Sequence, residues 1–435
     1  MKKVFLLVAA AVMSASVSFA QVDDKEAAKA AKAAAKALKA EIKAANNVLR
    51  EAQGQLNSLE GDIVQANVLI EAAMENKHTA SNPDTWYTAG KIQNKIYDKE
   101  NEKMYLQQPY DQEVFFSSLS KMFDYFIKCD ELEQIPDEKG RVIAKYRPET
   151  SDLLSRLRIN LVSGGVTYFN ADANEKAFDF FAKYIDVADE PILAAYNLKE
   201  TDTLIYEIAY YATLAGLKME DYNKALKYVD LAMNKQDVAQ KAVEYKALSY
   251  LNLGDTVQWL NTLKEGVEKY PSVEYFYSNL ISYYNINGNT ADLMAFADEM
   301  LAKNPLPIFR FVKGFVYQNM PDYEKAIEEY KVAIEQDPNY VGAYRNLGIC
   351  YCQLAQNESD KMNTMNIKSA AYKKQKEVVN SYYRLALPVY EHLRKIDDGT
   401  DPDVRSAWTT GLYTCYYMLN MGKEFEEIEK IVNQY

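Results

Sequence analysis

The chain is poor in the residues that most enzyme centres use. It has two histidines, His78 and His392, among 435 residues. A metal site or a histidine-activated nucleophile would need a fold that brings them together. A glycine-rich phosphate loop and the HExxH and GxSxG motifs are also missing. Carboxylates are plentiful, but those in helical segments alternate with lysine, as they do on solvated faces. We therefore expect no catalytic site, no cofactor and no bound metal.

Cysteine is scarce as well. The four cysteines are Cys129, Cys350, Cys352 and Cys415. Cys350 and Cys352 lie two residues apart in a segment with helical periodicity, so their side chains point to different faces and cannot form a disulfide with each other. The spacing does not indicate a disulfide framework. We expect all four to be small, buried apolar residues.

Beyond the first twenty residues, no apolar run is long enough to span a bilayer. Residues 1–20 begin with two lysines, continue with an apolar stretch from Val4 to Val17, and end with Ser18 and Ala20. This order is typical of a secretory signal peptide, cleaved here after Ala20. No cysteine stands at the cleavage point, where Gln21 follows Ala20, so a lipid anchor is not expected. We expect an exported protein that is periplasmic or associated with the outer membrane, without a transmembrane segment.

Positive charge is in deficit. The formal net charge is −12, and it becomes −14 without the two lysines of the signal peptide, since 50 − 2 leaves 48 basic residues against 62 acidic ones. An acidic surface disfavours nucleic acid and anionic lipid as partners. We therefore expect no nucleic acid among its partners.

What the sequence does contain is a repeat. Small or apolar residues recur at strides of 34, 34 and 33 residues, at Ala225, Trp259, Leu293 and Ala326. Each copy holds two apolar periodicities of helical spacing, separated by a polar corner. A single helix pair cannot bury its own apolar face, so neighbouring pairs must stack. The period therefore predicts an all-α protein, an α-solenoid of stacked antiparallel helix pairs.

The best-preserved copy, residues 307–340, resembles the tetratricopeptide repeat (TPR) family. It carries at that family's spacing Gly314, Tyr317, Tyr323, Ala326, Tyr330, Ala333 and Pro338. The resemblance implies a right-handed superhelix in which small residues let paired helices cross closely. The residues expected to serve this packing are Gly165, Ala177, Ala225, Ala232, Ala247, Gly314, Ala326, Ala333 and Gly348.

Register and composition divide the chain into segments. The expected order is a signal peptide (1–20), a leading helix rich in alanine and lysine (21–46), degenerate helix pairs with long loops (47–200), regular repeats (201–356), and a repeat with an extended insertion followed by a closing helix pair (357–435). Within this order we expect a loop over residues 134–149 and an extended connection over residues 187–200. The late return of the pattern at Ala386 and Tyr390 predicts that the helices flanking the insertion are lengthened.

In the TPR family the first helix of each repeat lines the concave face on which partners bind. The residues in phase with that face here mix aromatics with amides, which suits a groove for an extended peptide or a helix. They are Glu207, Tyr210, Tyr275, Ser278, Asn285, Phe311, Gln318, Asn319 and Arg345. Phe311 has an alternative role, in which it only packs between repeats. The family's clamp for an acidic C-terminal tail needs several basic and amide residues, of which only Arg345 is in place.

Three functions compete. The first is a non-enzymatic scaffold or adaptor of a Gram-negative cell envelope, of the type found in Bacteroidetes, that binds protein or peptide partners and associates with outer-membrane complexes. The second is a solute- or glycan-binding protein related to helical outer-membrane nutrient-capture proteins, although their lipid-anchor cysteine and large non-repeat portion are not evident. The third is a hydrolase, which would need converging carboxylates. The resemblance favours the scaffold.

Overall fold

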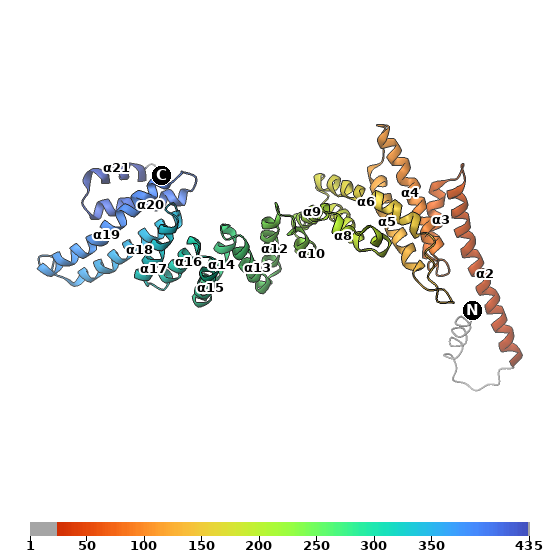
Figure 1. Ribbon diagram of the computed structural model, residues 1–435, viewed down its shortest axis with the longest axis horizontal. Helices are drawn as coiled ribbons and strands as arrows, with labels where there is room; N and C mark the ends of the chain where they lie inside the picture. Colours follow the sequence, from red (N-terminus) through yellow and green to blue (C-terminus); the bar gives the residue numbers. More distant parts are fainter. Residues whose placement is uncertain (1–23, 434–435) are drawn as a thin grey trace. The chain divides into compact units, whose positions relative to one another are not determined.

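The computed structural model describes residues 24–433, and side chains from residue 26 onward except that of Asn285. The predicted signal peptide lies outside these residues. Within the described range every regular element is a helix, as the sequence predicts (Figure 1). None of the described helices is both long and apolar enough to cross a membrane. The chain forms two compact units, one ending at Lys224 and one starting at Ala225.

The first unit contains helices that pack in consecutive pairs, α2 with α3, α4 with α5, and α6 with α7. Asp62, Asn82 and Asp111 cap α3, α4 and α5 by accepting hydrogen bonds from backbone N–H groups of the first turn. The helices are α2 Asp24–Asn57, α3 Ile63–Glu75, α4 Pro83–Tyr105, α5 Gln112–Glu133, α6 Arg147–Asn170, α7 Asn174–Asp186, η1 Val187–Asp189, η2 Pro191–Tyr196, α8 Leu198–Thr201 and α9 Leu204–Lys218.

The leading helix does not end near residue 46. α2 continues to Asn57, so one helix contains both the alanine- and lysine-rich segment and the first helix of the following pair. Asparagine inside a helix costs only a fraction of a kcal/mol, about 0.7 at most relative to alanine. Burial of Leu49 and Ala52 against α3 outweighs that cost, because both belong to an apolar cluster with Ile70.

The predicted extended connection over residues 187–200 is wrong, because η1, η2 and α8 occupy it. Val187, Ile192 and Leu193 are buried, and η2 packs on α6. Short helical turns bury these apolar side chains while pairing their own backbone groups, which an extended strand without a neighbour cannot do. The predicted loop over residues 134–149 is confirmed for residues 134–146, whereas residues 147–149 already belong to α6, which begins at Arg147.

The second unit holds the regular repeats. α10 (Tyr222–Lys227) spans the boundary, and each of the six helices from α12 to α17 has 13 to 15 residues. Each packs on the next along the chain. The helices are α11 Val229–Ala232, α12 Ala239–Leu253, α13 Thr256–Lys269, α14 Glu274–Ile286, α15 Thr290–Lys303, α16 Pro307–Asn319, α17 Tyr323–Gln336, α18 Val341–Asp360, η3 Lys361–Thr364, α19 Ala370–Ile396, α20 Pro402–Met418 and α21 Gly422–Val432.

The insertion lengthens a helix pair, as the sequence predicts. α18 and α19 have 20 and 27 residues, and the ends joined by η3 extend past the neighbouring helices (Figure 1). Near that end, the Gln375 amide donates hydrogen bonds to the carbonyl and the carboxylate of Glu358, at 3.1 and 2.6 Å. The two helices are therefore linked to each other along the projecting part as well as at their base.

Paired helices cross where an aromatic ring of the second helix lies on a glycine of the first. A Cβ atom added to Gly314 would lie 2.6 Å from a ring carbon of Tyr330, and one added to Gly165 would lie 2.3 Å from Phe181. Gly348 has the same relation to Tyr390, at 2.5 Å. No side chain fits such spaces, so glycine at these positions sets the closeness of the helices. All nine residues assigned above to packing are buried.

Candidate partner-binding face

The residues in phase with the predicted groove lie in both units. Glu207 and Tyr210 are half-buried on α9 of the first unit, and Tyr210 packs edge-on against Tyr211 at a ring distance of 6.1 Å. The remaining candidates lie on α14, α16 and α18 of the second unit, where α16 and α18 contact each other directly. The described geometry therefore brings together the candidates on α16 and α18. The face considered below consists of these two helices and α14 of the same unit.

Phe311 packs inside the stack. Its ring lies 5.7 Å from that of Tyr330 and 5.3 Å from that of Tyr340. Phe311 is half-buried and touches both apolar clusters of the second unit. Its contacts match the alternative role considered for it, packing between successive repeats. Only the part of the ring that remains exposed is free to meet a partner.

Gln318 has an internal hydrogen bond as well. Its side-chain oxygen accepts the hydroxyl of Tyr330 at 2.7 Å, and the Asn346 amide donates to the same hydroxyl at 3.2 Å. Tyr330 is fully buried, and burial raises the pKa of its phenol above the ordinary value, so the group remains a donor. An unpaired hydroxyl at this depth would destabilise the fold. Gln318 and Asn346 thus satisfy a core tyrosine from the first helices of two successive repeats.

α14 presents Tyr275 and Ser278, both half-buried. Tyr275 lies edge-on to Phe276 at 5.5 Å, and burial raises the pKa of its phenol. The Asn279 amide donates to the Tyr275 carbonyl at 2.6 Å, which occupies that amide locally. The side chain of Ser278, the residue before Asn279, has no hydrogen bond among the described residues. The side chain of Asn285 lies outside the described residues.

Two predicted residues of this face are exposed. Asn319 ends α16, and Arg345 lies in the second turn of α18. Across residues 26–433, no described carboxylate lies within ion-pair distance of Arg345. An exposed guanidinium without an internal partner is available for a carboxylate of another molecule.

The sequence analysis missed a charge network between repeats. Lys313 of α16 pairs with Asp298 of α15 at 2.8 Å and with Glu329 of α17 at 3.3 Å, while Arg310 pairs with Glu329 at 3.0 Å. Burial lowers the pKa of Lys313, but the two carboxylates outweigh it and raise the pKa overall. The spacing in the sequence could have predicted this network, because Arg310 and Lys313 lie three residues apart on one helix and both flanking helices carry acidic residues.

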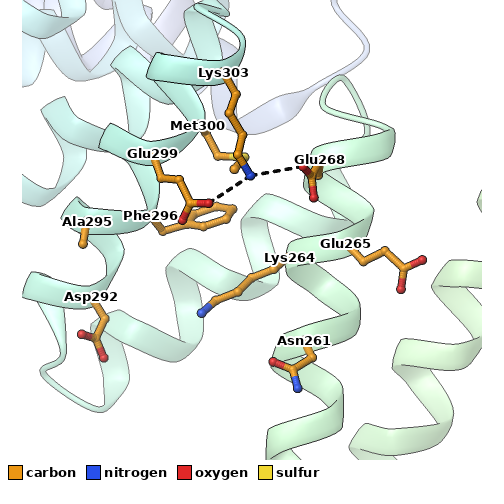
Figure 2. Close-up of a pocket in the computed structure, with 10 residues that line it drawn as sticks. All are labelled: Asn261, Lys264, Glu265, Glu268, Asp292, Ala295, Phe296, Glu299, Met300 and Lys303. Carbon is orange, nitrogen blue, oxygen red and sulfur yellow. Dashed lines mark hydrogen bonds and ion pairs between the residues drawn. The ribbon is translucent and has the colours of Figure 1, made fainter.

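A hollow of about 560 Å³ lies between α13 and α15, which are second helices of successive repeats. Lys303 bridges its rim by pairing with Glu268 at 3.2 Å and Glu299 at 3.0 Å (Figure 2). The side chain of Lys264 extends into the space between the helices, and Phe296 supplies an apolar wall (Figure 2). The hollow is charged and open, and it lies away from the face predicted from the sequence.

Neither histidine belongs to a cluster of ligands. His78 contacts the carboxylate of Glu41 at 3.4 Å, and His392 lies 3.1 Å from the Pro338 carbonyl and stacks on Tyr344. Among the side chains that the structure describes, no group of three or more histidines, cysteines and carboxylates is placed to hold a metal ion.

Comparisons with known proteins give one family match. A model described as TPR repeat matches residues 322–354, which cover α17 and the first part of α18. No curated protein matches the chain.

Several solved structures resemble it at low identity. A TPR repeats protein from Bacteroides fragilis is 18% identical, with a TM-score of 0.32, over 58% of this chain and 97% of that one. A tetratricopeptide repeat protein from Parabacteroides merdae is 15% identical, with a TM-score of 0.23, over 71% and 99%. Yeast Tom70 is 13% identical, with a TM-score of 0.28, over 90% and 95%.

The identification rests on three observations. The TPR model matches where the sequence pattern is clearest, at residues 322–354. The helices stack as consecutive pairs, with small residues buried at their crossings. An aromatic ring lies on a glycine at Gly314 and Tyr330, inside the segment that first showed the resemblance. The chain is a tetratricopeptide repeat protein with an all-α solenoid fold.

Proposed function

We propose that the protein is a non-enzymatic scaffold or adaptor that binds protein or peptide partners on the face formed by α14, α16 and α18. The TPR fold suggests a protein interaction scaffold. The observation that carries the finer proposal is Arg345, which is exposed on α18 and has no ion-pair partner among the described residues. On the other first helices, Tyr275 and Phe311 offer partly exposed rings. Such a combination suits a peptide that carries a carboxylate near an apolar side chain.

We place this activity in the cell envelope. The support is the pattern of residues 1–20, with its lysines, apolar stretch and small residues before Gln21. Association with outer-membrane complexes and an origin in Bacteroidetes belong to the same proposal. Both are inferred from repeats that are rich in tyrosine and asparagine. We do not propose the glycan-binding alternative, since the hollow between α13 and α15 is lined chiefly by charged side chains rather than by aromatic rings.

The proposal is tested by capture from envelope extract with matched charge reversals. The full chain is immobilised as wild type, as Arg345→Glu and as Lys264→Glu, and bound proteins are crosslinked and identified. The two variants change charge by the same amount, but Lys264 lies at the hollow between second helices. We expect Arg345→Glu to lose partners that wild type and Lys264→Glu retain. Full retention by Arg345→Glu, or loss only in Lys264→Glu, would place binding elsewhere.

A further inference from the structure

Two cysteines from different repeats meet in the second unit. Cys352 lies on α18 and Cys415 on α20, and the two thiols are close enough to shift each other's pKa. α18 and α20 also pack directly on each other, although α19 separates them in the chain. Both thiols are free in this structure. The sequence predicts four packing cysteines and carries no sign of this pair.

Tyr390 of α19 explains why the two helices come so close. Its ring lies on Gly348 of α18 and on Gly411 of α20, and an added Cβ on either glycine would be 2.5 Å from the ring. Each glycine precedes its cysteine by four residues, which is one helical turn. Both cysteines therefore lie one turn beyond the point of closest approach and on the same side of it. The Tyr390 hydroxyl is 3.9 Å from the Cys352 sulfur.

The surroundings distinguish the two thiols. Cys415 is buried, whereas Cys352 is half-buried. Hydrogen bonds from Cys415 and Tyr390 favour the Cys352 thiolate and lower its pKa, although burial opposes this shift. The neighbouring Cys352 and burial together raise the pKa of Cys415. Cys352 is thus the more accessible of the two, and its surroundings favour the thiolate, the form that attacks a disulfide.

Cys350 provides an internal comparison. It lies two residues before Cys352 on the same helix and is fully buried. Burial raises the pKa of its thiol to about 12, so it is protonated and unreactive at neutral pH. Among residues 26–433, burial is the only influence on the pKa of Cys350, and no second thiol contributes to it.

We propose that Cys352 and Cys415 form a reversible disulfide that joins α18 to α20 when the protein meets a disulfide oxidant. The Cys352 thiolate attacks one sulfur of the oxidant's disulfide, forming a mixed disulfide and releasing one oxidant thiolate. Cys415 then loses its proton, attacks the Cys352 sulfur and displaces the second oxidant thiolate. The two cysteine thiols are oxidised, and the oxidant's disulfide is reduced to two thiols, which take up the two protons.

The bond would hold the closing helix pair against the stack. It would link positions 63 residues apart, since 415 − 352 is 63, and long loops gain most from such a link in the chain-entropy description. α20 and α21 end the array, where a terminal repeat has a neighbour on one side only. A disulfide between α18 and α20 would therefore stabilise the terminal helices α20 and α21, which pack on the rest of the array on one side only. This effect needs no binding partner and does not depend on the function proposed above.

The test uses the purified full chain in defined mixtures of oxidised and reduced glutathione. After free thiols are blocked, the protein is digested with trypsin and joined peptides are identified by mass spectrometry. Cys350 and Cys352 share the tryptic peptide 346–361, so a Cys350→Ser variant removes the ambiguity, while Cys415 falls in peptide 406–423. We expect these two peptides to be joined in wild type and in Cys350→Ser, and not in Cys352→Ser or Cys415→Ser.

The thermal unfolding midpoint gives a second readout. Oxidised wild type should unfold at a temperature higher than reduced wild type by on the order of 10 °C. Because both states come from one unmodified sequence, the comparison remains valid even if a serine variant folds poorly. The proposal is overturned if the folded protein keeps both thiols free under oxidised glutathione, if the joined peptides appear only after denaturation, or if Cys129 takes the place of either cysteine.

Discussion

The ring of Tyr330 occupies the space that a side chain on Gly314 would need, with a closest approach of 2.6 Å to an added Cβ. Gly90 and Phe126 repeat this relation in the first unit at 2.4 Å. Glycine on the first helix and an aromatic ring on the second therefore form one packing unit. Changes at either member should affect stability in a predictable direction.

Gly314→Ala should destabilise the second unit by about 1–3 kcal/mol, because the new methyl group overlaps a buried ring that has no room to move. The measurement is thermal or urea unfolding followed by circular dichroism. Gly54→Ala is the matched control, since Gly54 lies inside α2 and an added Cβ there meets nothing within 4 Å. That control should be neutral or stabilising by roughly 0.5–1 kcal/mol. Equal effects of the two changes would refute the packing argument.

Tyr330→Phe should destabilise by about 1–3 kcal/mol, because it leaves the side-chain amides of Gln318 and Asn346 without their partner. Tyr284→Phe is the control. It removes a hydroxyl from another buried tyrosine, and that hydroxyl has no hydrogen bond among the described residues. It should be close to neutral. Comparing the two unfolding curves isolates the hydrogen bonds from the loss of a hydroxyl as such. A neutral Tyr330→Phe would mean that Gln318 is free for a partner after all.

Ala326→Arg should lower stability by several kcal/mol, of order 3–5, since Ala326 is fully buried at a helix crossing and the substitution both overpacks the site and buries a charge. Glu328→Arg introduces the same side chain at an exposed position of the same helix. It should change stability by less than about 0.5 kcal/mol. An unchanged melting curve for Ala326→Arg would contradict the stacked arrangement.

Asp397 makes part of the stability depend on pH. Its carboxylate accepts a hydrogen bond from Trp408 Nε1 at 2.7 Å and another from the Gly399 backbone N–H at 2.8 Å. The hydrogen bond from Trp408 contributes most to lowering the pKa of Asp397. A carboxyl with a lowered pKa in the folded state stabilises above the unfolded-state value, about 4, and loses this effect as the pH falls through the folded-state value.

Asp397→Asn should therefore lower the unfolding temperature near pH 7, and the difference from wild type should shrink toward about pH 3. Asp403→Asn, at an exposed position of the same region, removes the same charge without those donors and serves as the control. A difference for Asp397→Asn that is constant across this range would show that the carboxylate's ionisation is not involved.

Much of the fold followed from spacing. The strides that begin at Ala225 and end at Ala326 predicted stacked helix pairs, and the late return at Tyr390 predicted the long pair α18 and α19. Helix ends were harder to predict, because Asn46 and Asn47 favour a helix end locally, while burial of Leu49 keeps α2 intact. Local preference and tertiary burial compete at such points, and the sequence displays only the first.

The candidate site was less predictable. Helical phase tells which way Gln318 and Phe311 point, but not whether a side chain from a neighbouring element reaches them first. Tyr330 and Tyr340 do so here. The contact between Cys352 and Cys415 was hidden for another reason, since the insertion between them breaks the stride that relates all other positions. Long-range contacts that depend on an irregular segment have no periodic signal.

The central claim, that partners bind on the first helices of the repeats, is tested most directly by site-specific photo-crosslinking. A photoreactive residue is placed in turn at Ser278 and Arg345, and at Lys264 and Glu299 of the hollow between second helices. The protein is then illuminated in living cells or native envelope extract. The account predicts partner adducts from positions 278 and 345 and none from 264 and 299. Adducts confined to positions 264 and 299 would contradict it.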